Sequence, residues 1–301
     1  MVESVAVPTK RLTLVSWLTL VSLLGVPCAA VQAQALIPHT LQLDATRLEQ
    51  QGLTLAQEAS QLAQFQQYGL ALQRAQLATQ LVPKSPEIWA LLGGLYIQEK
   101  RLDEGITALN RAKSLNARNS AVLFALGSAY FQKGNYLTAV NYLQDGLKIK
   151  PNVPGALFDL GNAYLMLRQY DKAIAQYETA IAQEKTFWPA INNIGLIKYE
   201  TGDVNTAIKL WRQAVTIDEK AAEPMLAIAV ALYAKGDREQ GLALGESAIR
   251  LDSRYSDLKH LKENLWGDRL LADTKALLET PRIQATIAQA QERKPQPTPE
   301  P

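Results

Sequence analysis

The chain has 301 residues, of which 48% are hydrophobic and 20% charged, which are ordinary proportions for a folded globular protein. Its formal net charge is only +2 and its Lys and Arg residues are scattered, so the composition argues against a nucleic-acid-binding surface. A single cysteine excludes a framework of intramolecular disulfides.

Residues 1–33 have the pattern of a secretory signal peptide. Two basic residues at positions 10 and 11 precede an uncharged apolar run over residues 12–26, and small residues follow at Val31, Ala33 and Ala35. A basic start, about fifteen apolar residues and a small-x-small site are typical of such a signal. We expect cleavage after Ala33, with cleavage after Ala35 as the second choice.

The alternative to cleavage is a retained membrane anchor. The apolar run is shorter than the roughly twenty residues that a membrane span needs, which favours cleavage. Lipid attachment at Cys28 is disfavoured because Pro27 stands where a small residue is required. Cleavage would remove Cys28, leaving no thiol and no membrane span in the mature chain.

A fixed period dominates the middle of the chain, after a predicted linker and helix start in residues 34–51. Gly93, Gly127, Gly161 and Gly195 recur 34 residues apart, each after a large aliphatic residue. Such a period indicates a stack of similar units. Six units cover residues 52–255, and they begin at Gly52, Pro86, Ser120, Pro154, Trp188 and Ala222.

Within each unit the apolar residues recur at helical spacing in two groups. Positions four, seven and eleven form one stripe, and positions twenty, twenty-four and twenty-seven form another. Small residues at positions eight, twenty and twenty-seven let the two helix backbones approach closely. Gly134, Gly202 and Gly236, all at position fifteen, predict a left-handed end to the first helix. Each unit is therefore predicted to be a helix–turn–helix hairpin.

This pattern is similar to the tetratricopeptide repeat across residues 52–255. The departures lie in the terminal units, at Glu58 and Ala59 and at Ala229 and Leu232, as expected where one side of a unit has no neighbour. The resemblance implies an all-α, right-handed α-solenoid whose concave surface binds peptides or partner helices.

In this family the concave surface is lined by positions two, five, nine, twelve and thirteen of the first helices. The resemblance therefore implies a peptide-binding groove formed by Ala90, Ile97, Phe124, Ser128, Phe131, Phe158, Asn162, Leu165, Met166, Asn192, Leu196, Tyr199, Leu226, Val230 and Tyr233. Contiguous apolar patches of this kind mark binding surfaces. The alternative is that these side chains pack against adjacent helices.

The predicted groove also indicates what kind of partner it accepts. The family's clamp for acidic C-termini of heat-shock chaperones uses Lys, Arg and Asn at positions two, five, six and nine. Units two to five carry no Lys or Arg at these positions. We therefore expect an apolar peptide or helix with few charges.

The repeat register ends after Tyr255, and residues 256–292 contain two further apolar helical stripes. They predict a pair of helices that cap the solenoid, or alternatively a docking element with Trp266 as its anchor. Residues 262–281 are also similar to C-terminal segments of exported repeat proteins from photosynthetic lineages, which implies a thylakoid lumen as an alternative to a periplasm. Residues 293–301 are rich in proline and predict a disordered tail.

The sequence predicts no catalytic, cofactor or metal site. His39 and His260 are the two histidines of the chain, and neither has a partner at ligand or triad spacing. We therefore expect a non-enzymatic, exported scaffold that binds another protein and assists assembly of a complex. A self-associating homo-oligomer is the alternative, and an enzyme with an unrecognised site is the third hypothesis.

Overall fold

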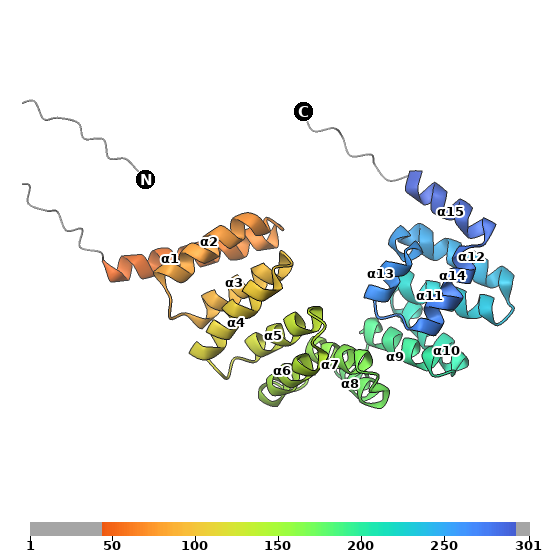
Figure 1. Ribbon diagram of the computed structural model, residues 1–301, viewed down its shortest axis with the longest axis horizontal. Coiled ribbons are helices and arrows are strands. Elements are labelled where there is room, and N and C mark those ends of the chain that lie inside the picture. The colour runs from red at the N-terminus through yellow and green to blue at the C-terminus, as the bar shows by residue number, and fades with distance from the viewer. Residues whose placement is uncertain (1–43, 293–301) are drawn as a thin grey trace, which may run out of the picture. The chain divides into compact units, whose positions relative to one another are not determined.

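The structure, a computed structural model, describes residues 44–292, in which helices joined by short turns are the regular elements and no strand occurs (Figure 1). Consecutive helices pack as hairpins, and each hairpin packs on the next. The hairpin helices are α1 Ala45–Gln64, α2 Tyr68–Leu81, α3 Pro86–Gln98, α4 Leu102–Leu115, α5 Ser120–Gln132, α6 Tyr136–Ile149, α7 Pro154–Met166, α8 Tyr170–Gln183, α9 Trp188–Glu200, α10 Val204–Ile217, α11 Ala222–Ala234 and α12 Arg238–Leu251. This arrangement is an α-solenoid and confirms the predicted fold class.

Several predictions concern residues outside the described range. The signal peptide of residues 1–33, its cleavage sites, His39 and the tail of residues 293–301 all lie there. Of the predicted segment 34–51, the described part begins α1 at Ala45, where the Asp44 side chain accepts hydrogen bonds from the backbone N–H groups of Thr46 and Arg47.

The first helices of units two to six begin at the residues predicted as unit starts. Local chemistry explains some of these boundaries: Pro86 and Pro154 occupy a first helical position, where the missing N–H costs nothing. The Ser85 hydroxyl caps α3 and the Asn119 side chain caps α5, each by accepting hydrogen bonds from backbone N–H groups of the first turn.

Position fifteen is left-handed in every unit, as predicted for the three glycines. Gly134, Gly202 and Gly236 have φ of +77°, +94° and +99°. The same position holds residues with side chains in the other units, with φ of 59°, 61° and 57° at Gln66, Lys100 and Arg168. Such residues adopt this conformation at a cost of about 1–2 kcal/mol. The hairpin packing, rather than glycine itself, therefore imposes the turn.

The glycines at position eight are points of close helix approach. A Cβ atom at Gly93 would lie 2.6 Å from Leu109 Cγ, and one at Gly161 would lie 2.5 Å from Tyr177 Cε1. The residue at position twenty-four of the second helix thus rests directly on the glycine of the first. Because real Cβ contacts are longer, a side chain at position eight would force the two helices apart.

The last unit departs from this arrangement. It has Ala229 at position eight and Gly245 at position twenty-four, so it lacks the large side chain that fills the hairpin in units two to five. Leu277 and Ile283 from the C-terminal helices approach Gly245 instead and fill that space. The C-terminal helices therefore complete the core of the last unit.

The segment after α12 forms three α-helices where the sequence predicts two. It contains a 3₁₀ turn at Ser253–Ser256, then α13 Leu258–Glu263, α14 Asp268–Leu278 and α15 Pro281–Glu292. Leu265, with φ of +66°, follows the end of α13, and Pro281 separates α15 from α14. Helix α14 packs on α9 and α11, while α15 packs on α12 (Figure 1).

Candidate protein-binding surface

We call the surface formed by positions two, five, six, nine, twelve and thirteen of α3, α5, α7, α9 and α11 the first-helix face. The predicted groove residues on it divide into three groups. Asn192, Leu196, Tyr199, Leu226 and Val230 are at most 1% exposed. Asn162 and Leu165 are each 9% exposed. Ala90, Ile97, Phe124, Ser128, Phe131, Phe158 and Tyr233 are half-buried, and Met166 is 37% exposed.

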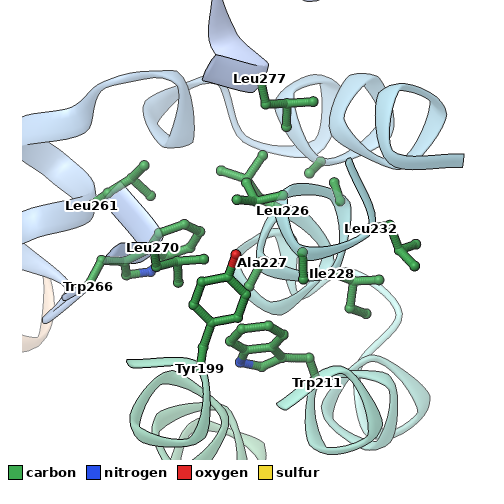
Figure 2. Close-up of a cluster of buried hydrophobic side chains, with 14 of the residues drawn as sticks. Tyr199, Trp211, Leu226, Ala227, Ile228, Leu232, Leu261, Trp266, Leu270 and Leu277 are labelled. Atoms are coloured by element: carbon green, nitrogen blue, oxygen red, sulfur yellow. The ribbon is translucent and has the colours of Figure 1, made fainter. Parts of the chain in front are cut away.

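The chain's own C-terminal segment covers α9 and α11. Figure 2 shows Trp266 and Leu270 beside Tyr199, within the same buried cluster as Leu226 and Leu261. Trp266 is 3% exposed and its Nε1 donates a 2.9 Å hydrogen bond to Glu223 Oε1. Trp266 therefore anchors this chain's own helices, and in this structure it is not a docking residue for an outside partner.

Glu200 on α9 holds the N-terminus of α14. Its carboxylate accepts hydrogen bonds from the backbone N–H groups of Arg269, at 3.2 Å, and Leu270, at 2.9 Å. These N–H groups lack partners within their own helix, and the helix dipole favours a negative charge there. Gly267 permits this approach, because a Cβ atom at that position would overlap the Glu200 side chain.

Two more hydrogen bonds join α14 to Tyr199 on α9. The Tyr199 hydroxyl donates to Asp273 Oδ2 at 2.7 Å, and Arg269 Nη1 donates to the Tyr199 backbone oxygen at 3.1 Å. Burial raises the pKa of the Tyr199 phenol, and the hydrogen bond to Asp273 raises it further. Hydrogen bonds as well as apolar packing thus fix α14 on α9 and α11, which form the covered part of the first-helix face.

Two asparagines, Asn162 and Asn192, are predicted to contact a bound peptide, but in the structure they form hydrogen bonds within the chain instead. Asn162 Oδ1 accepts hydrogen bonds from the Tyr177 hydroxyl at 2.7 Å and from Asn193 Nδ2 at 2.9 Å. Asn192 Nδ2 donates to Asn193 Oδ1 at 3.2 Å, and the Asn192 backbone oxygen accepts from Trp211 Nε1. This network joins α7, α8, α9 and α10 inside the solenoid.

Asp159 is a residue of the first-helix face that the sequence prediction omitted. It lies at position six of α7 and is half-buried, and its side chain has no hydrogen bond or ion pair within residues 44–292. Burial raises the pKa of its carboxyl group to about 6. Asp159 is the only charged residue of α7, which is the signal in the sequence that could have identified it.

The raised pKa of Asp159 predicts a pH-dependent effect of Asp159→Asn. The folded state binds the proton more tightly than the unfolded state, so Asp159 lowers stability as the pH rises from about 4 to above 6. At pH 7.5 the variant should be more stable than the parent by about 1–3 kcal/mol, and at pH 4 the two should agree. Urea unfolding at both pH values measures this difference.

The matched control for Asp159→Asn is Glu178→Gln on α8, where the carboxylate is exposed and its loss should change stability little. Equal unfolding free energies of the parent and Asp159→Asn at pH 7.5 would contradict the burial of an unpaired charge.

A cleft of about 250 Å³ lies where the open and covered parts of the first-helix face meet. Its walls come from α7, α9 and the segment that joins α13 to α14. The lining residues are Leu165, Met166, Arg168, Tyr170, Leu196, Glu200, Lys262, Leu265, Trp266, Gly267 and Asp268. Among the lining charges, Arg168 and Asp268 pair with each other at 3.3 Å. The remaining surface of the cleft is mainly apolar.

Residues 44–292 contain no group of three or more His, Cys, Asp or Glu residues that could hold a metal ion. None of the helices in that range is long and apolar enough to cross a membrane. His260 lies on α13, where its ring packs edge-on against Tyr255 at 5.1 Å between ring centroids.

Comparison with known proteins gives matches of fold and family. Residues 62–129 and 130–194 match the family described as tetratricopeptide repeat. A search of curated proteins returned no match.

Three solved structures illustrate the similarity of fold. The structure of Pseudomonas aeruginosa pilF has a TM-score of 0.60 and 15% identity, covering 73% of this chain and 99% of its own. The Cut9–Hcn1 complex has a TM-score of 0.62 and 18% identity, covering 78% of this chain and 45% of its own. The MamA structure has a TM-score of 0.50 and 24% identity, covering 55% of this chain and 96% of its own. The 34-residue hairpins, the family match over residues 62–194 and these folds agree, and they identify the repeats as tetratricopeptide repeats.

Proposed function

We propose that this chain is an exported, non-enzymatic scaffold that binds another protein on the open part of its first-helix face, formed by α3, α5 and α7, and so assists assembly of a protein complex. The observation that carries the proposal is a contrast between equivalent repeat positions. Leu196, Tyr199, Leu226 and Val230 on α9 and α11 are buried in the cluster that contains the C-terminal helices. The residues that stay partly exposed on α5 and α7 are Phe124, Ser128, Phe131, Phe158 and Met166.

The covered part indicates what the surface accepts. An amphipathic helix of this chain, α14, lies there with its apolar side in the buried cluster, and its N-terminus meets a carboxylate of the face. A segment of similar chemistry from a second protein suits the open part, in the manner of a helix in a groove. The structural neighbour Cut9–Hcn1 is a hetero-tetramer, so one protein of this fold assembles with a different chain.

Affinity capture with surface variants tests this proposal. Phe124 and Phe158 are unsuitable positions, because Phe124 packs on Gly146 and Phe158 packs edge-on against Phe187, so charges there would disrupt the hairpins. Ser128 and Met166 are better targets. We expect Ser128→Arg with Met166→Glu to abolish capture of the partner from an envelope extract, with unchanged helicity by circular dichroism.

The matched control is Leu137→Glu, which places a charge at a 64% exposed apolar residue of α6, away from the first-helix face. Quantitative mass spectrometry compares the captured proteins. Capture that is equal for the double variant and the control would contradict binding on the open face.

Export is supported by the basic and apolar pattern of residues 10–26 and by the small residues that follow it. A periplasm and a thylakoid lumen both fit such a signal. Mass spectrometry of the N-terminus of the mature protein tests export, and a chain that begins at Met1 would contradict cleavage.

Self-association is the alternative function. It is supported by four exposed apolar side chains on the first hairpin, namely Leu53, Phe65, Leu70 and Leu77. Light scattering over a wide concentration range separates the two, since a monomer throughout would exclude a homo-oligomer.

A further inference from the structure

We propose that the partner presents a lysine or arginine to Asp159 and, about 10 Å away, a bulky apolar side chain to the cleft beside Met166. This inference rests on the proposed function and defines the chemistry of the segment that the open face binds.

The first step of the argument is the unpaired charge of Asp159. The carboxylate of Asp159 is half-buried and therefore loses hydration, and within residues 44–292 its side chain makes no hydrogen bond or ion pair that would compensate the loss. Other carboxylates of the face are satisfied: Glu200 accepts from the α14 backbone, and Glu223 accepts from Trp266. Asp159 therefore has no positively charged partner in the described part of the chain, and a bound protein can supply one.

The second step is the alignment of Asp159 with the cleft. Asp159, Asn162 and Met166 are spaced by three and four residues on α7, which places them on one face of the helix. Seven residues span nearly two turns, a rise of about 10 Å. Met166 is 37% exposed and lines the cleft together with Leu165, whereas Asp159 lies toward the other end of the helix.

The third step is the character of the cleft. Leu165, Leu196 and Leu265 supply apolar walls, and at its rim Arg168 already pairs with Asp268. A cavity of about 250 Å³ holds a leucine, phenylalanine or tryptophan side chain. Burying such a side chain there continues the apolar cluster that Trp266 and Leu270 form with α9 and α11.

The destabilising effect of Asp159 supports a role in binding. An uncharged residue of the same shape would fold more favourably at neutral pH, because burial disfavours the charged carboxyl group. Groups that reduce stability without a compensating contact in the folded chain are characteristic of functional sites. Pairing with a partner cation would remove this penalty on binding.

Selection from a phage-displayed library of random 12-residue peptides tests the inference on the full mature chain. The parent protein and the Glu178→Gln control should select apolar peptides that carry a Lys or Arg at a constant distance from a Leu, Phe or Trp. With Asp159→Asn, the selected peptides should stay apolar and lose the basic residue. With Met166→Glu, they should lose the large apolar residue.

Titration of one selected peptide gives the quantitative test. Asp159→Asn should weaken its binding by at least about tenfold, and so should replacing the basic residue of the peptide with norleucine. The two changes together should cost little more than either alone, because they remove the same pair.

The outcomes separate the two proposals. Apolar peptides with no preference for a basic residue, or additive effects in the titration, would overturn the pairing with Asp159 and leave the proposed function in place. Peptides whose binding ignores Met166→Glu would overturn the apolar site in the cleft. A selection that yields no peptides would overturn both the inference and the proposed function.

Discussion

Replacing Trp266 with alanine is expected to lower the free energy of unfolding by about 3–5 kcal/mol, the usual cost of removing a buried aromatic side chain. Trp266 is 3% exposed and belongs to the cluster that joins α14 to α9 and α11 (Figure 2). The substitution also removes the donor to Glu223, whose carboxyl pKa is already raised by burial. A cavity and an unpaired acidic group would then coincide.

Urea unfolding measures the loss, and amide hydrogen exchange shows where it acts. Faster exchange in α14 than in α3 would indicate that the C-terminal helices detach first and uncover Tyr199 and Leu226. The control is Leu251→Ala, which truncates a 48% exposed leucine at the end of α12 and should cost far less. A Trp266→Ala variant as stable as this control would contradict the packing described here.

Two adjacent glycines of α3 should respond in opposite directions to alanine. At Gly93 the added Cβ would lie 2.6 Å from Leu109 Cγ and 3.1 Å from the Gly105 backbone oxygen, so Gly93→Ala should destabilise the protein by about 1–3 kcal/mol. At Gly94 no atom lies within 4 Å of the added Cβ, so Gly94→Ala should stabilise the helix by about 0.5–1 kcal/mol.

The pair forms its own control, because both substitutions gain the same helix propensity and differ in the space available. Thermal or urea unfolding of the two variants and the parent gives the comparison. Two variants of equal stability would show that position eight is not a point of close approach.

The local features of the repeat were accessible from the sequence because they depend on residues close together in the chain. The starts of α3 and α5 follow from their capping residues, and the starts of all five first helices, α3, α5, α7, α9 and α11, follow from the period of the apolar stripes. The left-handed turns at Gly134, Gly202 and Gly236 follow from a conformation that glycine adopts freely. Such signals act within one or two helical turns.

The candidate binding surface could be predicted from the sequence only in part. Family positions identified the residues of the first-helix face, but exposure depends on what lies over each one. Tyr199 and Leu226 are buried by helices that lie about seventy and forty residues later in the chain. Met166 also belongs to the first-helix face, but its side chain stays 37% exposed. Asp159 was missed because its lack of a partner is a property of the space around it.

The sequence by itself therefore determined the repeat, its hairpins and the glycines where helices approach, since these follow from periodicity and backbone preference. The tertiary structure alone decided which part of the first-helix face is free. Leu277 and Ile283 fill a gap left by Gly245, and Gly267 lets Glu200 reach the N-terminus of α14. These contacts join residues far apart in the chain, and their geometry depends on how side chains of several helices fit together in three dimensions.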